Sequence, residues 1–480
     1  SGSVAAGALV TDGAQPATGA APAPAGPGSA AVAPAGTANR TAAVAGVTAP
    51  AATGVGSASG VSPGAGGSSV GTGTTGSAAV TANHCGAPGA TDVGVTATTI
   101  TIGVIVVDLG QASNLIAVPS ADDQKKAHTA VFNQINKNGG VLCRKLVPKF
   151  YTDGVFDTSQ EHAQCLQMQA DKVFAVFNNL FNTSEQTCIP KAKIPNVWYT
   201  PPHTPDVRMY SPYILSWQPD FDQLIHQYVF GAKAQGYFSG MKKLGILTQT
   251  CYPDEFPALK KELSAAGIDP AKASVFDYGC SQSPQSPQSD QAAVLQFKRD
   301  GVTHIVNVHY NNDANFSIAA DQQNYFPRFA HMEDASATAI ETGSTKPGKS
   351  FNNTLLISTI QTGAAHTPGY RFNKPTQDCT KLLAANGLPS AYSAGVAALF
   401  GIACIDGALF KAMAERMPVL RRNQLAVAMT KLGALDLAYP GGPINVTNAK
   451  IPTGGQLARP GVWQSSCNCW KVTDVHWRAF

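Results

Sequence analysis

Residues 98–107 read TTITIGVIVV, a nearly continuous run of β-branched side chains. Apolar residues at successive positions predict a strand buried on both faces, as in a parallel sheet. A helix is expected next, because Ser120 and Asp123 have the spacing of a capping box. Gly139 and Gly140 are typical of the end of such a helix. The segment therefore predicts the first strand–helix unit of an α/β sheet.

The same alternation repeats along the chain. We expect further strands at 173–177, 244–247, 275–278, 304–308 and 355–360, and helices at 221–229, 256–266, 291–299, 314–323, 392–416 and 423–432. Strands that alternate with helices predict a parallel, doubly wound sheet, and this number of units exceeds one compact sheet. Past Gly441 the rhythm is lost, and Trp463, Trp470 and Trp477 predict a strand-like capping segment pinned by Cys467 and Cys469.

The N-terminal residues 1–84 consist mainly of Ala, Gly, Ser, Thr, Val and Pro, and Asp12 and Arg40 are their only charged residues. Such a segment buries too little apolar surface to offset the entropy of ordering. We therefore expect residues 1–96 to be a disordered tether that holds a domain near a membrane or cell wall. A start inside low-complexity sequence fits a chain whose leader has been removed. This predicts an extracytoplasmic protein, secreted or anchored to the cell surface, with or without an attached lipid.

The charge and the cysteine content argue against a nucleic-acid-binding protein and for an exported protein with disulfides. Charged residues make up 13% of the 480 residues and the net charge is +4, which is too weak a field to predict nucleic-acid binding. Ten dispersed cysteines in an exported chain favour disulfides over buried thiols in a cytosolic protein. Sequence order suggests the pairs Cys143–Cys165, Cys251–Cys280 and Cys379–Cys404, although spacing alone does not determine the connectivity.

Two motifs suggest other chemistry. Residues 343–350, GSTKPGKS, match the phosphate-binding pattern G-x-x-x-x-G-K-S, which requires a preceding strand and a following helix. Here the predicted strand follows the motif, so an exposed loop is favoured and a nucleotide-using enzyme is the lesser alternative. Cys467, Cys469 and His476 lack a fourth metal ligand at a known spacing. We expect no catalytic residue, no metal and no cofactor.

Residues 135–146, INKNGGVLCRKL, resemble a known family. The stretch is similar to the INxxGGxxGRKL passage from first helix to second strand in type I periplasmic solute-binding proteins of the branched-chain amino-acid class. IPNVW at 194–198, KLGIL at 243–247, LSAAG at 263–267 and the small-residue helix near 389–414 follow in the same order. The resemblance covers 97–480. It implies two Rossmann-like lobes joined by a three-segment hinge, with lobe one at 97–216 and 357–455 and lobe two at 217–356 and 456–480.

The resemblance also implies a site and a role. A small molecule would bind between the lobes, at loops that follow the carboxyl ends of strands. The candidate contacts are Asp108, Phe181, Asn182, Thr200, Tyr252, Tyr310, Glu333 and Asp334. Phe181-Asn182 replaces the serines expected there, so an aromatic or less polar solute is as compatible as an amino acid. The implied partner is the permease of an ABC importer, and the alternative is a ligand-sensing receptor module on the same fold.

Overall fold

The chain is described here from a computed structural model. It describes Cys85 and residues 89–108, 119–154, 158–178, 183–249, 253–279, 287–308, 313–333, 337, 340–341, 343, 345–389 and 396–480. Of the predicted tether, residues 1–96, the first 84 residues lie outside this part of the chain.

The first sheet is parallel throughout. Its strands, in the spatial order β2-β1-β3-β4-β5, are β1 (Thr99–Val107), β2 (Lys145–Asp153), β3 (Ala175–Asn178), β4 (Asn196–Trp198) and β5 (Ile214–Ser216). β1 is buried almost along its whole length, as its run of β-branched residues predicts. β2 forms an edge, where Pro148 is tolerated because one side of an edge strand needs no ladder hydrogen bonds.

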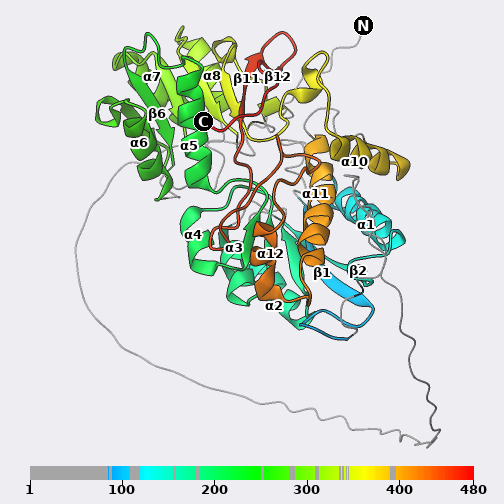
Figure 1. Ribbon diagram of the computed structural model, residues 1–480. Helices are drawn as coiled ribbons and strands as arrows, with labels where there is room; N and C mark the ends of the chain where they lie inside the picture. The colour runs from blue at the N-terminus through cyan, green and yellow to red at the C-terminus, as the bar shows by residue number, and fades with distance from the viewer. Residues whose placement is uncertain are drawn as a thin grey trace, which may run out of the picture. The chain divides into compact units, whose positions relative to one another are not determined.

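Helices from two distant parts of the chain pack with the first sheet (Figure 1). They are α1 (Ala121–Lys137), α2 (Thr158–Ala170), α3 (Thr183–Lys191), α4 (Thr204–Tyr210), α10 (Lys374–Ala385), α11 (Val396–Glu415) and α12 (Leu425–Thr430). Ser120 caps α1 as one half of the predicted capping box, since its Oγ accepts from the N–H of Asp123 at 3.1 Å. The carboxylate of Asp123 accepts from Ser120 Oγ at 2.9 Å, which is not the backbone bond of the other half. Phe410 of α11 packs against Phe174 with ring centroids 6.0 Å apart, so a late helix completes an early core.

The second sheet is larger and mixed. Its strands are β6 (Leu244–Thr248), β7 (Ser274–Asp277), β8 (His304–Asn307), β9 (Arg328–Met332), β10 (Leu355–Ser358), β11 (Arg459–Gln464) and β12 (Cys469–Val472), in the order β12-β11-β10-β9-β8-β6-β7. The five strands β6–β10 are parallel, and β11 and β12 add an antiparallel hairpin, which confirms the strand-like tail. The accompanying helices are α5 (Phe221–Ala234), α6 (Glu255–Ala265), α7 (Pro287–Arg299) and α8 (Asp313–Gln322). Short 3₁₀ turns are η2 (Pro270–Lys272), η3 (Lys349–Phe351), η4 (Ala364–His366) and η5 (Arg422–Gln424).

The chain passes between the two sheets three times, after β5, after β10 and before β11. We call residues 216–220 and 452–456 the hinge segments. They lie against each other, since Gly454 N donates to Ser216 O at 2.9 Å and to Gln218 O at 3.0 Å. Gly455 has φ +69°, and a Cβ there would lie 2.4 Å from Cδ of Pro219. Glycine therefore permits a backbone approach that another residue would obstruct.

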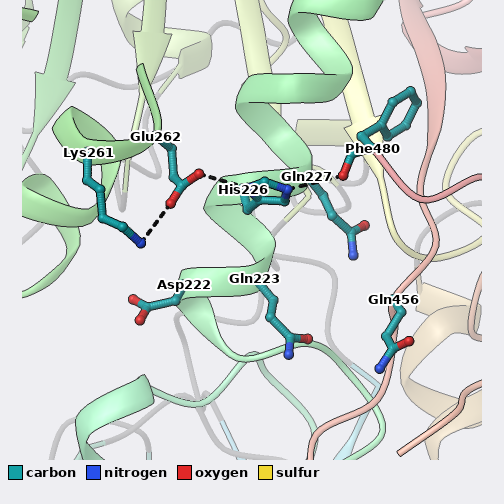
Figure 2. A pocket seen from close by; sticks show the side chains of 8 residues that line it. All are labelled: Asp222, Gln223, His226, Gln227, Lys261, Glu262, Gln456 and Phe480. Carbon is teal, nitrogen blue, oxygen red and sulfur yellow. Dashed lines mark hydrogen bonds and ion pairs between the residues drawn. The ribbon is translucent and has the colours of Figure 1, made fainter. Parts of the chain in front are cut away.

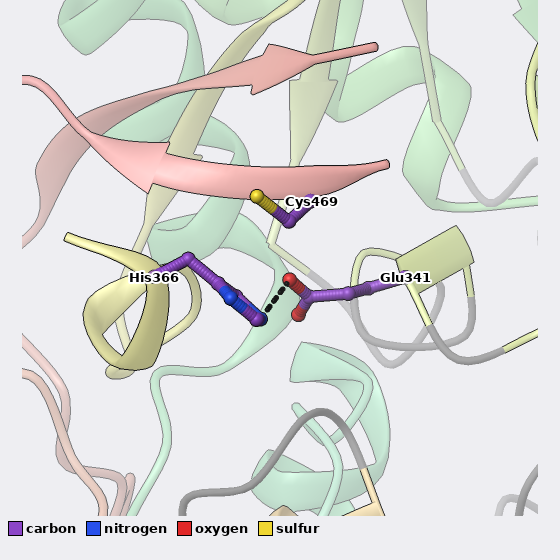
Figure 3. Close-up of side chains that lie close together, drawn as sticks. All are labelled: Glu341, His366 and Cys469. Atoms are coloured by element: carbon purple, nitrogen blue, oxygen red, sulfur yellow. Dashed lines mark ion pairs between the residues drawn. The ribbon is translucent and has the colours of Figure 1, made fainter. Parts of the chain in front are cut away.

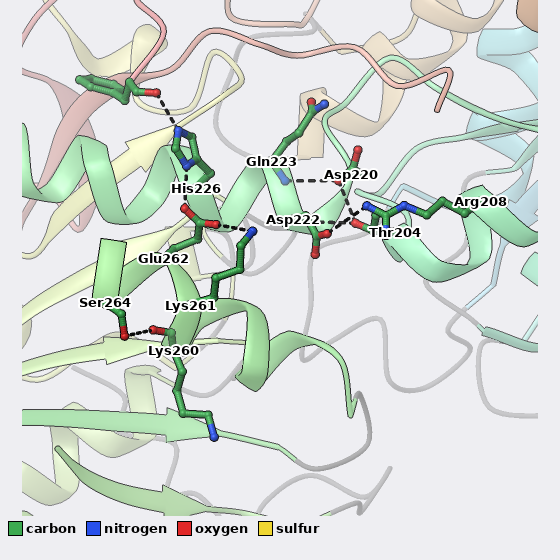
Figure 4. A network of polar contacts seen from close by, with 11 residues as sticks. Thr204, Arg208, Asp220, Asp222, Gln223, His226, Lys260, Lys261, Glu262 and Ser264 are labelled. Carbon is green, nitrogen blue, oxygen red and sulfur yellow. Dashed lines mark hydrogen bonds and ion pairs between the residues drawn. The ribbon is translucent and has the colours of Figure 1, made fainter. Parts of the chain in front are cut away.

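Asp220 contacts both lobes and the second hinge segment; its contacts with Gln223 and Thr204 are drawn in Figure 4. Its buried carboxylate caps α5 by accepting from Gln223 N at 3.2 Å. Oδ1 also accepts from Thr204 Oγ1 of α4 at 2.8 Å, and Oδ2 accepts from Thr453 Oγ1 at 3.1 Å. The side chain of Asp220 thus contacts the first lobe, the second lobe and the hinge segment 452–456, where the chain crosses between the lobes for the third time.

The folded part begins earlier than the predicted start at residue 97. Val95 is buried and forms an isolated bridge with Ile100. The guanidinium of Arg144 donates to the carbonyl oxygens of Thr96 and Gly89 at 2.8 and 3.1 Å. The sequence of 89–96 resembles the tether, but these backbone contacts attach it to the first lobe.

Four disulfides lie in the described chain: Cys85–Cys143, Cys165–Cys188, Cys379–Cys404 and Cys467–Cys469. The predicted pair Cys379–Cys404 is confirmed. The predicted pair Cys143–Cys165 is wrong, because α2 packs on α3 and brings Cys165 to Cys188. Cys251 and Cys280 lie outside the described residues. Of the helices described, none is both long and apolar enough to cross a bilayer.

Candidate functional site

The two sheets share one strand order. The first runs β2-β1-β3-β4-β5, and the parallel part of the second runs β7-β6-β8-β9-β10, which is the same arrangement. In each sheet the chain first adds a strand on one side and then returns to add the next strands on the other side. This reversal falls between β1 and β3 in the first sheet and between β6 and β8 in the second. Ligands of open α/β sheets bind beyond the carboxyl ends of strands at this switch point. The loops there are the candidate site.

In the first lobe, two predicted site residues follow strand ends. Asp108 comes directly after β1, and its N–H donates to the carbonyl of Asp153 at 2.8 Å. Thr200 follows β4, and its Oγ1 accepts from the indole N–H of Trp198 at 2.5 Å. Between these strands β3 ends at Asn178, which is fully buried. The structure therefore brings Asp108 and Thr200 to the same edge, two strands apart.

In the second lobe, Glu333 directly follows β9 and is 1% exposed. Its N–H donates to Ile357 O of β10 at 3.1 Å, which fixes the backbone at the strand end. The neighbouring β8 ends at the buried Asn307, whose Nδ2 lies 3.1 Å from Nδ1 of His331. AVFN of β3 and HIVN of β8 thus place an asparagine at the corresponding position of each lobe.

Arg459 is a polar residue at this edge that the sequence reasoning missed. It pairs with Ser358 at the carboxyl end of β10 and is fully buried. Its guanidinium lies 4.7 Å from the ring centroid of Tyr370 and 4.2 Å from that of Trp477. Burial lowers the pKa of Arg459, and the proximity of Tyr370 and Glu333 opposes that shift. The only feature of the sequence that could have indicated Arg459 is its place at the start of a strand-like segment. That feature alone is weak evidence for a binding residue.

The other predicted site residues, Phe181, Asn182, Tyr252, Tyr310 and Asp334, lie outside the described part of the chain. The structure therefore places three of the eight candidates, all at strand ends. Their role in binding stays a prediction.

A contact between the lobes lies beside the hinge segments. His203, from the connection between β4 and α4, is almost buried and stacks on Phe221, the first residue of α5. Its Nδ1 lies 3.3 Å from Oε1 of Glu255 and 3.6 Å from Oδ2 of Asp254, at the start of α6. Burial alone would lower the pKa of His203, but the two carboxylates outweigh it and raise the pKa above the ordinary value.

This contact predicts a pH-dependent stability. Because the folded-state pKa of His203 is raised, its contribution is fully present below about pH 6.5 and is lost as the pH rises through the raised pKa. We expect chemical denaturation to show wild type more stable than His203→Gln at acidic pH, with the difference shrinking above neutrality. A difference that grows with pH would contradict the assignment. His476→Gln, at an exposed position, is the matched control.

A surface hollow of about 340 Å³ lies on α5 and α6 (Figure 2). His226 at its centre pairs with Glu262 Oε2 at 2.7 Å and with the main-chain oxygen of Phe480 at 3.1 Å. Burial would raise the pKa of Glu262, but His226 and Lys261 hold it below its ordinary value. None of the predicted site residues lines this hollow. It lies on a helical face and is not the site at the strand ends.

The phosphate-loop alternative is not supported by the geometry of its described residues. The N–H groups of Gly348 and Ser350 donate to Ser317 Oγ at 2.9 Å and to Asp321 Oδ1 at 2.8 Å, and Lys349 N also donates to Asp321. A carboxylate of α8 therefore occupies the amides that a phosphate would need. The segment is followed by the single turn η3 and then by β10. The strand therefore comes after the motif, as the sequence predicts, and not before it.

Solved structures of low sequence identity share this architecture. A fatty acid ABC transporter substrate-binding protein from Thermomonospora curvata aligns over 80% of this chain and 94% of its own, with TM-score 0.59 and 15% identity. A solute-binding protein from R. palustris in complex with 4-hydroxybenzoate aligns over 79% and 97%, with TM-score 0.58 and 16% identity. The fold is that of the type I periplasmic binding proteins.

A third solved structure is similar over most of the chain. An ABC transporter substrate-binding protein from Desulfitobacterium hafniense in complex with Leu aligns over 78% of this chain and 99% of its own, with TM-score 0.56 and 14% identity. No protein-family model and no curated protein matches the sequence. The resemblance at 135–146 thus predicts the type I fold correctly, although sequence comparison does not detect it.

Proposed function

We propose that this protein captures a small solute between its two lobes, at the carboxyl ends of the strands, and presents it to a membrane partner. The observation that carries the proposal is the repeated switch point: both sheets have the same winding, and each presents polar residues at the corresponding edge. The ligands named for similar structures, Leu and 4-hydroxybenzoate, are small molecules.

The proposed mechanism needs no covalent step. A solute that contacts both lobes favours the arrangement in which those contacts exist together, and its binding free energy shifts the population toward it. The hinge segments are held together by backbone hydrogen bonds and by the contacts of Asp220. A partner that recognises the closed arrangement then distinguishes loaded protein from empty protein. We accordingly propose a binding protein and not an enzyme.

The polar groups at the edge suggest the chemistry of the solute. The second lobe offers the buried Glu333 and the guanidinium of Arg459, which lies 4.7 and 4.2 Å from two aromatic ring centroids. The first lobe offers Asp108 and Thr200, together with the predicted Phe181 and Asn182. Such a set suits a small molecule with an apolar body and a few hydrogen-bonding groups. An amino acid, an aromatic acid and another small solute remain the three classes to test.

Thermal unfolding in the presence of small solutes tests the capture. A ligand that binds only the folded state at 100 times its Kd stabilises that state by about 2.7 kcal/mol, so a ligand raises the midpoint in a concentration-dependent way. We expect a hit among amino acids, aromatic acids, steroids or small amides, confirmed at one molecule per chain by calorimetry. If no such solute shifts the midpoint, the proposal loses its support.

Two matched variants test where the solute binds. Glu333→Gln and Tyr310→Ala should weaken binding of the hit by more than about tenfold, since they alter the proposed edge. Gln223→Ala in the hollow on α5 should leave the Kd unchanged. The reverse pattern would place the ligand in that hollow and contradict the proposed site.

The partner and the location belong to the same proposal. We propose an extracytoplasmic protein held near a membrane or wall by residues 1–84, with an ABC-importer permease as its partner. The solute-loaded chain can be used to capture membrane proteins that bind it. The identity of the captured protein distinguishes a transport role from a role in ligand sensing. Recovery of a permease supports transport, and recovery of a signalling receptor in its place overturns it.

A further inference from the structure

We propose that Cys469, Cys467, His366 and Glu341 form a zinc site when the Cys467–Cys469 disulfide is reduced. Three of these residues already lie together: one ligand atom each of Glu341, His366 and Cys469 lies within 4.8 Å of the others (Figure 3). Thiolate, imidazole and carboxylate are the donors that Zn²⁺ takes in four-coordinate protein sites. Cys467 is bonded to Cys469, so reduction supplies a second thiolate at the same place.

The fold holds two of these donors against one strand. η4 approaches β12 closely because Gly363 has φ +77°, and a Cβ there would lie 3.0 Å from the backbone of Trp470. Val472 N donates to Thr367 Oγ1 at 2.9 Å, which fixes the end of the turn that carries His366. From the other direction, Glu341 Oε1 accepts from Trp470 N at 3.3 Å. The donors therefore reach β12 on elements fixed by separate contacts.

The imidazole of His366 lies against the carboxylate of Glu341. His366 Nε2 lies 3.0 Å from Oε1 of Glu341, yet it makes no hydrogen bond of good geometry with any described residue. Cys469 is 2% exposed and the carboxylate of Glu341 is 8% exposed, so both lie where metal–ligand contacts are shielded from water. A divalent cation between them would satisfy the imidazole nitrogen and the carboxylate together.

The disulfide is the redox-sensitive part of the site. It spans a sequence separation of 2, so it restricts the unfolded chain far less than the bridges with separations of 23, 25 and 58. Cys467 is exposed, which gives an attacking thiolate access to its sulfur.

The reaction balances with an external dithiol as the reductant. One of its thiolates attacks Cys467 and releases Cys469 as a thiolate, and its second thiol then releases Cys467. The dithiol leaves oxidised, as its own disulfide. The protein gains two electrons and two protons, and Zn²⁺ binding then releases the thiol protons to solvent.

Metal titration of the full chain before and after anaerobic dithiol treatment tests the site. We expect the reduced protein to bind one additional Zn²⁺ by competition with a chromophoric chelator, and Co²⁺ to give a thiolate-to-metal charge-transfer band. Cys467→Ser/Cys469→Ser should abolish both signals. His366→Ala and Glu341→Gln should weaken Zn²⁺ binding by more than about tenfold.

Matched controls separate this site from other thiols. Cys85→Ser/Cys143→Ser removes another bridge that has exposed cysteines, and His476→Ala removes a nearby histidine of the tail; both should retain the signals. Equal Zn²⁺ binding by oxidised and reduced wild type would overturn the proposal, as would unchanged binding in reduced His366→Ala and Glu341→Gln. The thermal midpoint of each oxidised variant establishes that it has folded.

Discussion

Gly455→Ala is expected to lower the free energy of unfolding by about 3 kcal/mol or more, without touching any predicted ligand contact. The backbone at Gly455 has φ +69°, a conformation that costs an alanine about 1 kcal/mol or more. The new Cβ would also lie 2.4 Å from Pro219 Cδ and 2.8 Å from Pro219 N, so one hinge segment has to move. Overpacking of this kind costs about 1–3 kcal/mol in addition. Urea denaturation measures the change.

Gly433→Ala is the matched control for this prediction. Gly433 has φ +65° but no atom within 4 Å of the added Cβ, so it carries the backbone strain without the overlap. We expect it to cost about 1 kcal/mol. Equal losses at the two glycines would show that the close approach of the hinge segments contributes nothing to stability.

Asp220→Ala is expected to cost about 3 kcal/mol. The substitution removes the N-cap of α5, which contributes about 1 kcal/mol. It also leaves the hydroxyl groups of Thr204 and Thr453 without their buried acceptor, and each such loss costs about 1 kcal/mol or more. Chemical denaturation followed by tryptophan fluorescence measures the loss.

Two variants separate these contributions. Asp222→Ala lies two residues away and removes a partly exposed ion pair with Arg208 at 3.6 Å, together with weaker interactions with Thr204 and Lys261. We therefore expect a loss of less than about 1 kcal/mol. Asp220→Asn keeps one oxygen for the cap and should lie between wild type and Asp220→Ala. A loss at Asp222 as large as that at Asp220 would contradict the assignment of Asp220 as the connecting residue.

Local sequence signals predicted many of the strands and helices. They missed the long elements β2, α2 and α10 as well as the short strands β4 and β5. The β-branched run of β1 and the caps of α1 and α5 are local features, so they were readable without the fold. β4 and β5 have three residues each, too few to show a period. β9 was missed because Arg328 and His331 interrupt its apolar pattern, although His331 is buried in the fold by stacking on Trp470.

The sequence predicted where the candidate site residues lie, at the ends of strands. It did not predict which side chains from distant parts of the chain lie beside them. Asp108 follows a strand that its local sequence indicates, whereas Thr200 and Glu333 were placed by the family resemblance. The topology brings all three to strand ends. Arg459 could not be found this way, since its neighbours Tyr370 and Trp477 are distant in sequence and meet it only in the folded chain. For the same reason, sequence order misassigned Cys143 and Cys165.

The order of the strands and helices along the chain determines when each half of the fold can be completed during translation. The strands of the first sheet are complete at Ser216, but α11, whose Phe410 packs on Phe174, ends only at Glu415. The second sheet acquires its last two strands from residues 459–472. A growing polypeptide therefore cannot complete the first half until residue 415 has been made, nor the second half until residue 472 has been made. Cleavage or premature termination near residue 450 would remove two strands that the second sheet contains.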